Sequence, residues 1–486
     1  MRVGSPTGGL TQTTERRYEV SKAYVLTGLG YGDECKGATT HFICHREKAH
    51  TVIRTGGPQA MHNVLTGDGQ YYCFAQYGSG TLAGARTHLS QDMVIEPFTL
   101  LQDGEELRSD YGISDIFERM TIDERSLIVT PFQIAANRLR ELARGAGRHG
   151  SVGLGVGDTI LDGELLGDEV IFARDLGKPW LSEKLEAIRQ LKLQQLSEII
   201  QDAPLLPERA KPELALLNDP KMVDKATAVF NKLGWTAGIV DDSYLAYLLR
   251  QPGTVVFEPS QGVLLDRWYG WHPYTTRLDT TSSSTLRILR DCDYQGEVIR
   301  LGLIRAYQTR HGAGPFVTED KTMTQLLPDQ HNGQHEWQGH WRVGTLDILA
   351  TRYAIGVCGG PKAFDGLVVS CLDRMATLPV WQVCYAYQYT GADQVLSPFF
   401  EAEGLEITGI KVRPNSRDQA QLSHQEKLGV LLRQCQPRLT DIENDFRAYL
   451  AGIEDRFGIP VAVASYGPTE EDKKIFTLFT NLSRYA

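Results

Sequence analysis

Asp33, Lys36 and His62 are the side chains of this sequence whose types and surroundings best suit chemistry on a phosphate. Asp33 and Lys36 lie in a glycine-rich stretch, TGLGYGDECKG (residues 27–37), which follows the apolar run at residues 24–26. Backbone N–H groups freed by glycines and by a helix N-terminus can surround polyphosphate oxygens, and a lysine adds positive charge. Asp33 could hold Mg²⁺ or accept a proton. The spacing does not fit the G-x-x-x-x-G-K-[ST] phosphate loop.

His62 lies in a second glycine-rich turn, RTGGPQAMHN (residues 54–63). An imidazole titrates near neutral pH and can give a hydrogen bond or a proton to a phosphoryl oxygen. A carboxylate in a turn or a histidine in a loop is, by itself, more often structural than catalytic. The two loops together favour catalysis.

Five motifs, in order along the chain, resemble those of the adenylosuccinate synthetase family. The two glycine loops resemble its GDEGKGK and GGxNAGHT signatures. FEPSQGVLLD (residues 257–266) resembles FEGAQGTLLD, and YQTRHGAGPFVTE (residues 307–319) resembles Y-x-T-R-V-G-x-G-P-F-P-T-E. IPVAVASYGP (residues 459–468) resembles the late V-P-V-x-x-x-S-x-G-P strand and loop. The chain is therefore identified as a member of this family.

The resemblance implies a two-step ligase reaction. A base removes the N1 proton of a 6-oxopurine nucleotide, the 6-oxygen attacks the γ-phosphate of a nucleoside triphosphate, and an amine displaces the phosphoryl group. The implied catalytic residues are Asp33 as base, His62 at the γ-phosphoryl oxygens, Lys36 against the phosphate charge and Gln261 on the purine. Asp33 and the carbonyl of Met61 are the implied Mg²⁺ ligands.

The family motifs also imply a set of nucleotide-binding residues. These are the loop residues Gly30, Gly32, Glu34 and Gly37; Gln59, Ser151 and Thr276 for the substrate nucleotide; and Asp373, Ser465, Gly467 and Pro468 for the base of the triphosphate, GTP or ATP. Ser151 lies in GSVGLGVG (residues 150–157), which resembles G-T-T-G-R-G-I-G. Ser151 and Val152 stand in place of the two threonines of that motif, so only Ser151 keeps a hydroxyl group. The family arginine that reaches the partner subunit's nucleotide has no counterpart between residues 158 and 174.

The amine pocket departs most from the family pattern. The arginine-rich T-T-G-R-R-R-R-T-G-W-L-D loop, whose arginines clamp the carboxylates of aspartate, is matched by HEWQGHWRVGTLD (residues 335–347). Only Arg342 remains, Glu336 would repel a carboxylate, and two tryptophans would give the pocket an aromatic surface. The amine pocket is assigned to Arg310, His311, His340 and Arg342. We expect an amine that is less acidic and flatter than aspartate.

The base site and the cysteines carry smaller departures. The family's T-K-x-D motif appears as SCLD (residues 370–373). Asp373 supports guanine as the base of the triphosphate, but the lysine of the motif is missing, so the choice between GTP and ATP stays open. Cys35 stands where the family has glycine, and we expect it to pack. A metal site at His331, His335 and His340 is an alternative, but their spacing matches no common ligand pattern.

Alternating strands and helices predict an α/β fold with a mainly parallel central sheet, flanking helices and ligands beyond the carboxyl ends of the strands. A helix is expected at residues 36–47, and strands at residues 24–27, 50–55, 254–258, 302–309, 368–372 and 461–465. Residues 181–233, rich in Leu, Lys and Glu and interrupted by Pro204, Pro207 and Pro212, predict a helical subdomain. Residues 1–20 are expected to be a loose extension before a single catalytic domain, residues 21–486.

Composition indicates a cytoplasmic enzyme. The 486 residues are 42% hydrophobic and 23% charged, which is ordinary for a globular protein. No apolar run approaches the ~18 residues of a membrane helix, and the net charge of −10 argues against nonspecific nucleic-acid binding. Eight cysteines without C-x-x-C pairs predict reduced thiols. The expected partners are a purine nucleotide, a nucleoside triphosphate and an amine, and the resemblance implies a homodimer.

Three functions remain open from the sequence. The first is a divergent ligase that replaces the 6-oxygen of an IMP-, GMP- or dGMP-like nucleotide with an amine other than aspartate. The second is the ordinary synthetase, which joins IMP and aspartate with GTP. The third is a pseudoenzyme that binds purine nucleotides without ligating them; the retained Asp33, His62 and Lys36 argue against it.

Overall fold

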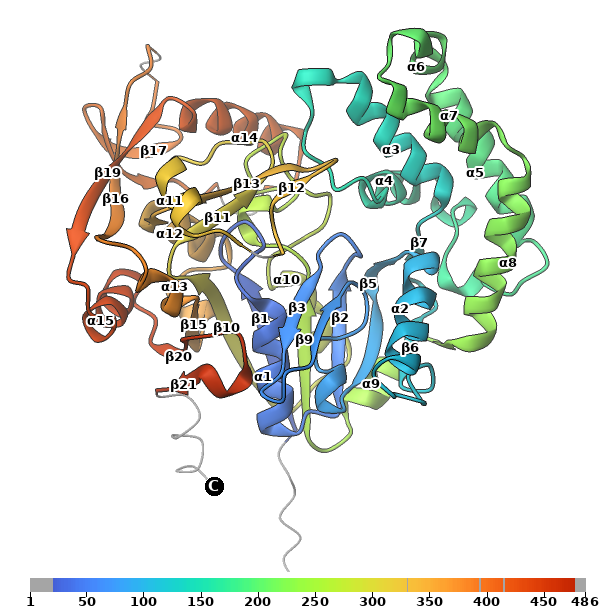
Figure 1. The fold of residues 1–486 in the computed structure, drawn as a ribbon, viewed down its shortest axis with the longest axis horizontal. Coiled ribbons are helices and arrows are strands. Elements are labelled where there is room, and N and C mark those ends of the chain that lie inside the picture. The colour runs from blue at the N-terminus through green and yellow to red at the C-terminus, as the bar shows by residue number, and fades with distance from the viewer. Residues whose placement is uncertain (1–20, 330, 393–394, 414–415, 477–486) are drawn as a thin grey trace, which may run out of the picture.

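The computed structural model describes residues 21–329, 331–392, 395–413 and 416–476, so the predicted loose extension at residues 1–20 lies outside the described residues. A large twisted sheet forms the centre (Figure 1). Its strands, in spatial order, are β21 (Lys473–Ile475), β20 (Val461–Ser465), β15 (Gly366–Ser370), β10 (Glu297–Arg305), β1 (Lys22–Gly28), β9 (Thr254–Pro259), β2 (Thr51–Gly56), β5 (Arg86–Ile95), β6 (Met120–Asp123) and β8 (Gly238–Val240), with β7 (Leu127–Ile128) paired to β5. Every pairing is parallel except β20 with β21, which confirms the predicted fold class.

Strand β1 shows why the centre of the sheet is apolar on both faces. Successive side chains of a strand point to opposite faces. Tyr24 and Leu26 join a cluster with residues of α1 (Lys36–Glu47), whereas Ala23 and Val25 pack with residues of α9 (Ser243–Leu249) and α10 (Ser283–Asp291). Helices thus cover both faces, as a parallel sheet requires.

The predicted helical subdomain forms α5 (Leu181–Gln195), α6 (Ser197–Gln201), α7 (Lys211–Asn218) and α8 (Lys221–Thr236). The prolines fall where predicted, since Pro204 lies in a short 3₁₀ turn after α6 and Pro212 in the first turn of α7. With α3 (Pro131–Ala143) and α4 (Val156–Leu166), these helices stand as a lobe beside the sheet (Figure 1). Their apolar core continues into α2 (Pro97–Ser109) and β5, so the lobe is joined to the sheet by packing. A single catalytic domain stays a prediction.

Smaller sheets and helices build the opposite lobe. The sheets are β11 (Gln308–His311), β13 (Gly339–Gly344) and β12 (Gln334–His335); and β14 (Leu346–Asp347), β16 (Trp381–Tyr389), β18 (Glu406–Ile410), β17 (Phe400–Glu403) and β19 (Cys435–Ile442). The hairpin of β3 (His62–Leu65) and β4 (Tyr71–Phe74) lies apart from this lobe, against α1 and the apolar cluster of α2 and β5. The helices are α11 (Lys321–Leu326), α12 (Ile348–Val357), α13 (Leu372–Met375), α14 (Gln419–Leu432) and α15 (Phe446–Phe457). No helix in the described ranges is long and apolar enough to cross a bilayer.

Two predicted strands extend past the residue at which the strand of the central sheet ends. The run at residues 302–309 divides after Arg305, because the N–H of Ala306 donates to the carbonyl of Ser370 and the chain then turns into β11 of another sheet. The predicted strand at residues 368–372 ends at Ser370, because Cys371 adopts a left-handed conformation that starts α13. Both changes occur at the carboxyl edge of the central sheet, where the motif loops after β1, β2, β9, β10, β15 and β20 converge.

Candidate active site

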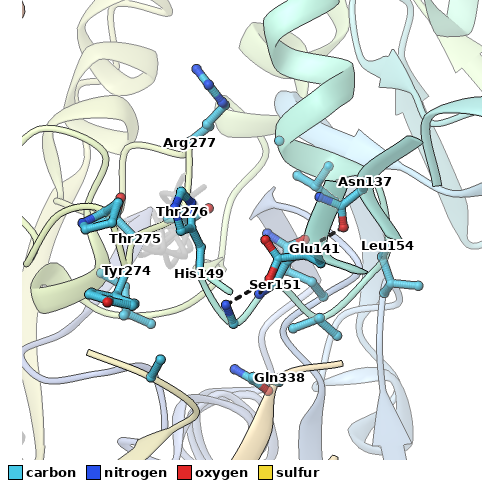
Figure 2. Close-up of a pocket in the computed structure, with 18 of the residues that line it drawn as sticks. Asn137, Glu141, His149, Ser151, Leu154, Tyr274, Thr275, Thr276, Arg277 and Gln338 are labelled. Atoms are coloured by element: carbon cyan, nitrogen blue, oxygen red, sulfur yellow. Dashed lines mark hydrogen bonds between the residues drawn. The ribbon is translucent and has the colours of Figure 1, made fainter. Parts of the chain in front are cut away.

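Two cavities lie at this edge of the sheet. The first, of about 380 Å³, lies between the helical lobe and residues 273–277. Figure 2 shows Thr275, Thr276 and Arg277 on one side of it and Asn137 and Ser151 on the other. The second, of about 370 Å³, lies over the glycine loop after β1 and the ends of β15 and β20.

The two cavities meet at Asp33 and His311. Asp33 lines the second cavity and His311 lines the first, and Asp33 Oδ1 lies 3.9 Å from His311 Nε2. Burial raises the pKa of Asp33, against the opposing effect of His311 and Arg305. Arg305 donates to the backbone carbonyl of Asp33 at 3.2 Å and so fixes the loop. A partly buried carboxylate therefore stands between two cavities.

The glycine loop is held together by its own charges. Glu34 accepts a hydrogen bond from the N–H of Gly32 at 2.8 Å and forms an ion pair with Lys36 at 3.1 Å. Lys36 also donates to the carbonyl of Gly32 at 2.7 Å. Lys36 lines the second cavity, whereas Glu34 and Gly30 line neither of the two cavities and lie behind the loop. Glu34 is therefore placed to shape the loop.

Gly37 allows the first turn of α1 to pass close to His62. A Cβ atom on Gly37 would lie 2.6 Å from the Cβ of His62 and 3.1 Å from Ser79 Oγ. Only glycine leaves room for this approach. The glycine spacing in the loop thus positions an imidazole that comes 25 residues later.

A buried ion cluster orients His62. Its Nδ1 lies 2.6 Å from Glu258 Oε1 and 2.9 Å from Arg54 Nη1, while its Nε2 has no hydrogen-bond partner among the residues that the structure describes. Burial lowers the pKa of His62 to about 4. Burial would raise the pKa of Glu258, but Arg54 and His62 outweigh it and lower that pKa to about 2. The ring is therefore neutral beside an ionised carboxylate.

The first cavity brings together the residues predicted for the substrate nucleotide. Gln59 and Gln261 both line it, and each side-chain Oε1 is buried without a partner in the described chain. Gln261 has a positive φ of 63°, and Gly32 lies against its backbone. Ser151 donates to Asn137 Oδ1 at 2.8 Å from the wall opposite Thr276 (Figure 2).

Several charged residues of the site were not predicted from the sequence. Arg140, Arg144 and Arg277 line the first cavity, and Arg305 lines the second. Arg277 directly follows Thr276, and Arg140 and Arg144 are one helical turn apart on and just after α3, so local position could have indicated them. Glu258, in the quoted FEPSQG motif, is a charge inside an apolar strand, which is itself a signal.

The residues predicted for the amine pocket do not all reach the cavities. Arg310 lines the first cavity, but it is buried and donates to the carbonyls of Pro315 and Tyr274. Arg342 forms an ion pair with Glu319 at 2.8 Å and lines neither cavity. His340 is exposed and also lies outside both. Of this set, His311 and Arg310 remain at the junction.

The expected aromatic surface is wrong. Trp337 is buried between the guanidinium groups of Arg138 and Arg209, at 5.3 and 5.0 Å from the ring centre. Trp341 is buried against His311, with ring centres 4.6 Å apart. Neither indole lines either cavity, because each has a packing partner that covers it.

The second cavity collects the residues predicted for the triphosphate base and the metal. Asp373, Ser465, Gly467, Pro468 and Met61 all line it. Burial raises the pKa of Asp373. Across the described ranges no group of three or more His, Cys, Asp or Glu side chains could hold a metal ion, so the His331, His335 and His340 alternative has no support. His331 instead stacks on Tyr71 at 4.7 Å.

Comparisons with known proteins agree with the motifs. A family model described as adenylosuccinate synthetase matches residues 25–474. Curated relatives include the adenylosuccinate synthetases of Chromohalobacter salexigens, 27% identical over 93% of this chain and 98% of the relative, and of Clostridium botulinum strain Eklund 17B, 29% identical over 76% and 82%.

Two solved structures share the fold. The fully ligated adenylosuccinate synthetase from Plasmodium falciparum has a TM-score of 0.70 at 17% identity, covering 94% of this chain and 100% of that one. The succinoaminodeoxyadenylate synthetase (PurZ) of cyanophage S-2L, bound to dGMP and dATP as an energy donor, has a TM-score of 0.56 at 14% identity, covering 96% and 98%. With the family match over nearly its whole length, this chain belongs to the adenylosuccinate synthetase family of ligases.

Proposed function

We propose that this protein is a nucleoside-triphosphate-dependent ligase that phosphorylates the 6-oxygen of a purine nucleotide and replaces it with an amine. The observation that carries the proposal is the position of Asp33 at the junction of two cavities of similar volume. A nucleotide in the first cavity and a triphosphate in the second would present the 6-oxopurine edge and the γ-phosphate to the same carboxylate. Such a base must lie within hydrogen-bond reach of the proton it removes.

His62 and Lys36 are proposed to act on the phosphates in the second cavity. Nδ1–H of His62 donates to the ionised Glu258, so Nε2 of the neutral ring carries a lone pair. Once the ring takes up a proton beside the phosphates, Nε2–H can donate to a phosphoryl oxygen. Lys36 provides a fixed positive charge that the glycine loop already orients. Both groups would stabilise charge that grows on the transferred phosphoryl group.

The residues present also fit the magnesium ion that the family implies. The carboxylate of Asp33 has no hydrogen bond to another described residue, and it faces a cavity that also contains Lys36. One carboxylate together with substrate phosphates is a common Mg²⁺ environment. Asp33 and the carbonyl of Met61 would hold the ion, which would neutralise phosphate charge.

The substrate is proposed to be an IMP-, GMP- or dGMP-like nucleotide, with GTP or ATP as the phosphate donor. The cyanophage neighbour, whose structure holds dGMP and dATP as an energy donor, supports the inclusion of dGMP and of an adenine donor. The second candidate is ordinary adenylosuccinate synthesis from IMP, aspartate and GTP, which the curated names of the relatives favour. Arg310 donates to a backbone carbonyl and Arg342 pairs with Glu319, so neither is free to bind the carboxylates of aspartate, which favours the first candidate.

Phosphate release by the purified protein tests the proposal. GTP, ATP or dATP is combined with IMP, GMP or dGMP, with and without aspartate and other amines. Release that depends on one nucleotide pair is expected, and Asp33→Asn should reduce it ~10²–10⁴-fold while triphosphate binding stays within about tenfold. Nucleotide binding without any release in every combination would instead establish the pseudoenzyme.

A further inference from the structure

Two cysteines face each other in the wall of the second cavity. Cys35 and Cys371 are 336 positions apart in the chain, yet their Sγ atoms lie 3.6 Å apart. Both line the cavity together with Lys36 and Asp373. Cys35 ends the glycine loop after β1, and Cys371 follows β15, so the pair bridges the phosphate end and the base end of the proposed triphosphate site.

The backbone presents both thiols in the same unusual way. Cys35 has φ 58° and Cys371 has φ 61°, so two of the five non-glycine residues with positive φ in the described chain are these cysteines. Each is the residue before a helix, and neither side chain makes a capping hydrogen bond. Left-handed non-glycine residues cluster at functional sites. The two sulfurs are therefore directed at each other rather than at the helix ends.

A buried positive charge lies beside the pair. Arg305, at the end of β10 between β1 and β15, interacts electrostatically with both sulfurs. An arginine next to a cysteine stabilises the thiolate, which is the reacting form. A disulfide has an S–S bond of about 2.05 Å, so closure needs an approach of roughly 1.5 Å by two loop residues. The geometry thus combines proximity, access from a cavity and a local positive charge.

We propose that Cys35 and Cys371 are an oxidation site, a dithiol that a peroxide converts to an intramolecular disulfide and that thereby closes the triphosphate cavity. In the first step the Cys35 thiolate attacks the peroxide, the O–O bond breaks, and hydroxide leaves as Cys35 becomes a sulfenic acid. The hydroxide takes the Cys371 proton, giving water. The Cys371 thiolate then attacks the sulfenyl sulfur, the S–O bond breaks and the second oxygen leaves as hydroxide, which takes up the proton that Cys35 released on forming its thiolate and becomes water. In sum, two thiols and hydrogen peroxide give one disulfide and two waters.

Closure would act on triphosphate binding because the new bond ties the glycine loop to the segment that carries Asp373. A bound triphosphate would in turn cover the thiols. The inference rests on the proposed triphosphate site for its consequence, but the cross-link itself can be detected without any ligase activity.

The test uses the full chain, reduced and then treated with hydrogen peroxide. We expect a mass loss of about 2 Da and a peptide that joins residues 35 and 371. Affinity for non-hydrolysable GTP and ATP analogues should fall at least about tenfold and recover with dithiothreitol. Prior saturation with an analogue should slow the cross-link. Cys371→Ser should stop at a sulfenic acid on Cys35, which a dimedone probe captures, and Cys35→Ser should form neither product.

Cys292→Ser, which removes a thiol outside the cavity, is the matched control and should keep the cross-link. Absence of the joined peptide at peroxide doses that oxidise Cys292 would overturn the oxidation site. A complete cross-link with unchanged analogue affinity would overturn closure of the cavity. If the reduced protein binds no analogue while the cross-link forms, the proposed triphosphate site fails and the oxidation site stands.

Discussion

Asp373 is the charged side chain that we propose selects the base of the triphosphate. It lines the second cavity with Ser465 and Gly467. It comes two residues after Cys371, whose sulfur faces Cys35 of the glycine loop. A carboxylate can pair with guanine N1 and N2 but has no such partner on adenine. The missing lysine of the family motif removes a second contact to the base, so this carboxylate carries more of the selectivity.

Asp373→Asn should therefore weaken GTP selectively, by roughly 1–3 kcal/mol, because an unpaired polar edge of the base is left behind. ATP should change little. Competition binding with both nucleotides measures the difference. Asp329→Asn, which removes one negative charge from the same cavity, is the control and should affect both nucleotides equally. Equal losses for Asp373→Asn would remove the guanine assignment.

Single residues in contiguous motifs could be predicted, whereas their partners from other segments could not. Asp33, Lys36, His62 and Gln261 all line the two cavities as their loops suggested. Glu258 lies within one of the family motifs, but its role could not be predicted, because its contact with Arg54 follows from the register of β9 on β2. The ion pair of Arg342 with Glu319 likewise depends on a fold that brings the two together.

At the scale of elements, the start of α1 determines where His62 stands. Gly37→Ala would place a methyl group 2.6 Å from the Cβ of His62. We expect the hairpin that begins with His62 to shift and turnover to fall at least ~10²-fold, because a misplaced catalytic group loses alignment. Steady-state kinetics provide the measurement. Gly452→Ala on α15, where an added Cβ meets nothing within 4 Å, should leave activity unchanged. Wild-type turnover in Gly37→Ala would show that this approach is unimportant.

The N-cap of α12 gives a pH-dependent prediction away from the cavities. Asp347 is buried, its side chain accepts from the N–H of Ala350 at 3.0 Å, and the hydroxyl of Tyr387 donates to it at 2.6 Å. Burial raises the pKa of Asp347 to about 6, despite those hydrogen bonds. The folded protein therefore holds a proton that the unfolded chain has lost, so this stabilisation is present below about pH 4 and disappears as pH rises through about 6.

The substitution Asp347→Asn retains a side-chain oxygen that can cap α12 but removes the negative charge. Relative to wild type, its free energy of unfolding should rise between about pH 4 and pH 7, by roughly 2–3 kcal/mol. Urea denaturation across that range measures the difference. Asp445→Asn at the exposed cap of α15, which also accepts from a backbone N–H, is the matched control. A difference that stays constant with pH would contradict the raised pKa.

The bounds of a helix or strand could be predicted where a local sequence pattern marks both of its ends. The helix at residues 36–47 and the strand at residues 461–465 have the expected bounds, because apolar runs and glycine turns mark their ends. The division of residues 302–309 between β10 and β11 could not be predicted, because the apolar character of the run continues while its pairing partner changes from β15 to β13. That exchange of sheets is a tertiary event, and it places Arg305 and His311 on either side of the junction.

At the scale of the whole molecule, two lobes stand beside one central sheet (Figure 1). The two cavities at the carboxyl edge of this sheet meet at Asp33 and His311. The helical lobe supplies Arg140 and Arg144 to the first cavity, while the sheet supplies the loops of both. In the proposed reaction the two half-reactions can therefore be separated: phosphoryl transfer would need the junction at Asp33, and amine transfer would need a third group that reaches the same point.

Aspartate is expected to be a poor substrate for the second half-reaction. Its two carboxylates need at least one bidentate cationic partner, and truncating such a contact typically costs ~2–5 kcal/mol. Arg310 is engaged by two backbone carbonyls and Arg342 by Glu319, so neither is free to clamp a dianion without losing an existing partner. The apparent Michaelis constant for aspartate should lie at least ~30-fold above the usual ~1 μM–1 mM range, or turnover should be unmeasurable.

The first half-reaction should survive without any amine. With triphosphate labelled at the β–γ bridge oxygen, the label should scramble into non-bridging β positions when the 6-oxopurine nucleotide is present, because phosphoryl transfer to the 6-oxygen is reversible and the β-phosphate of the diphosphate rotates before return. Asp33→Asn is the control and should abolish scrambling, since no base remains at the junction. Saturable adenylosuccinate formation at sub-millimolar aspartate would contradict the divergent amine and return this chain to ordinary adenylosuccinate synthesis, with Arg310 or Arg342 released from its present partners to bind the carboxylates.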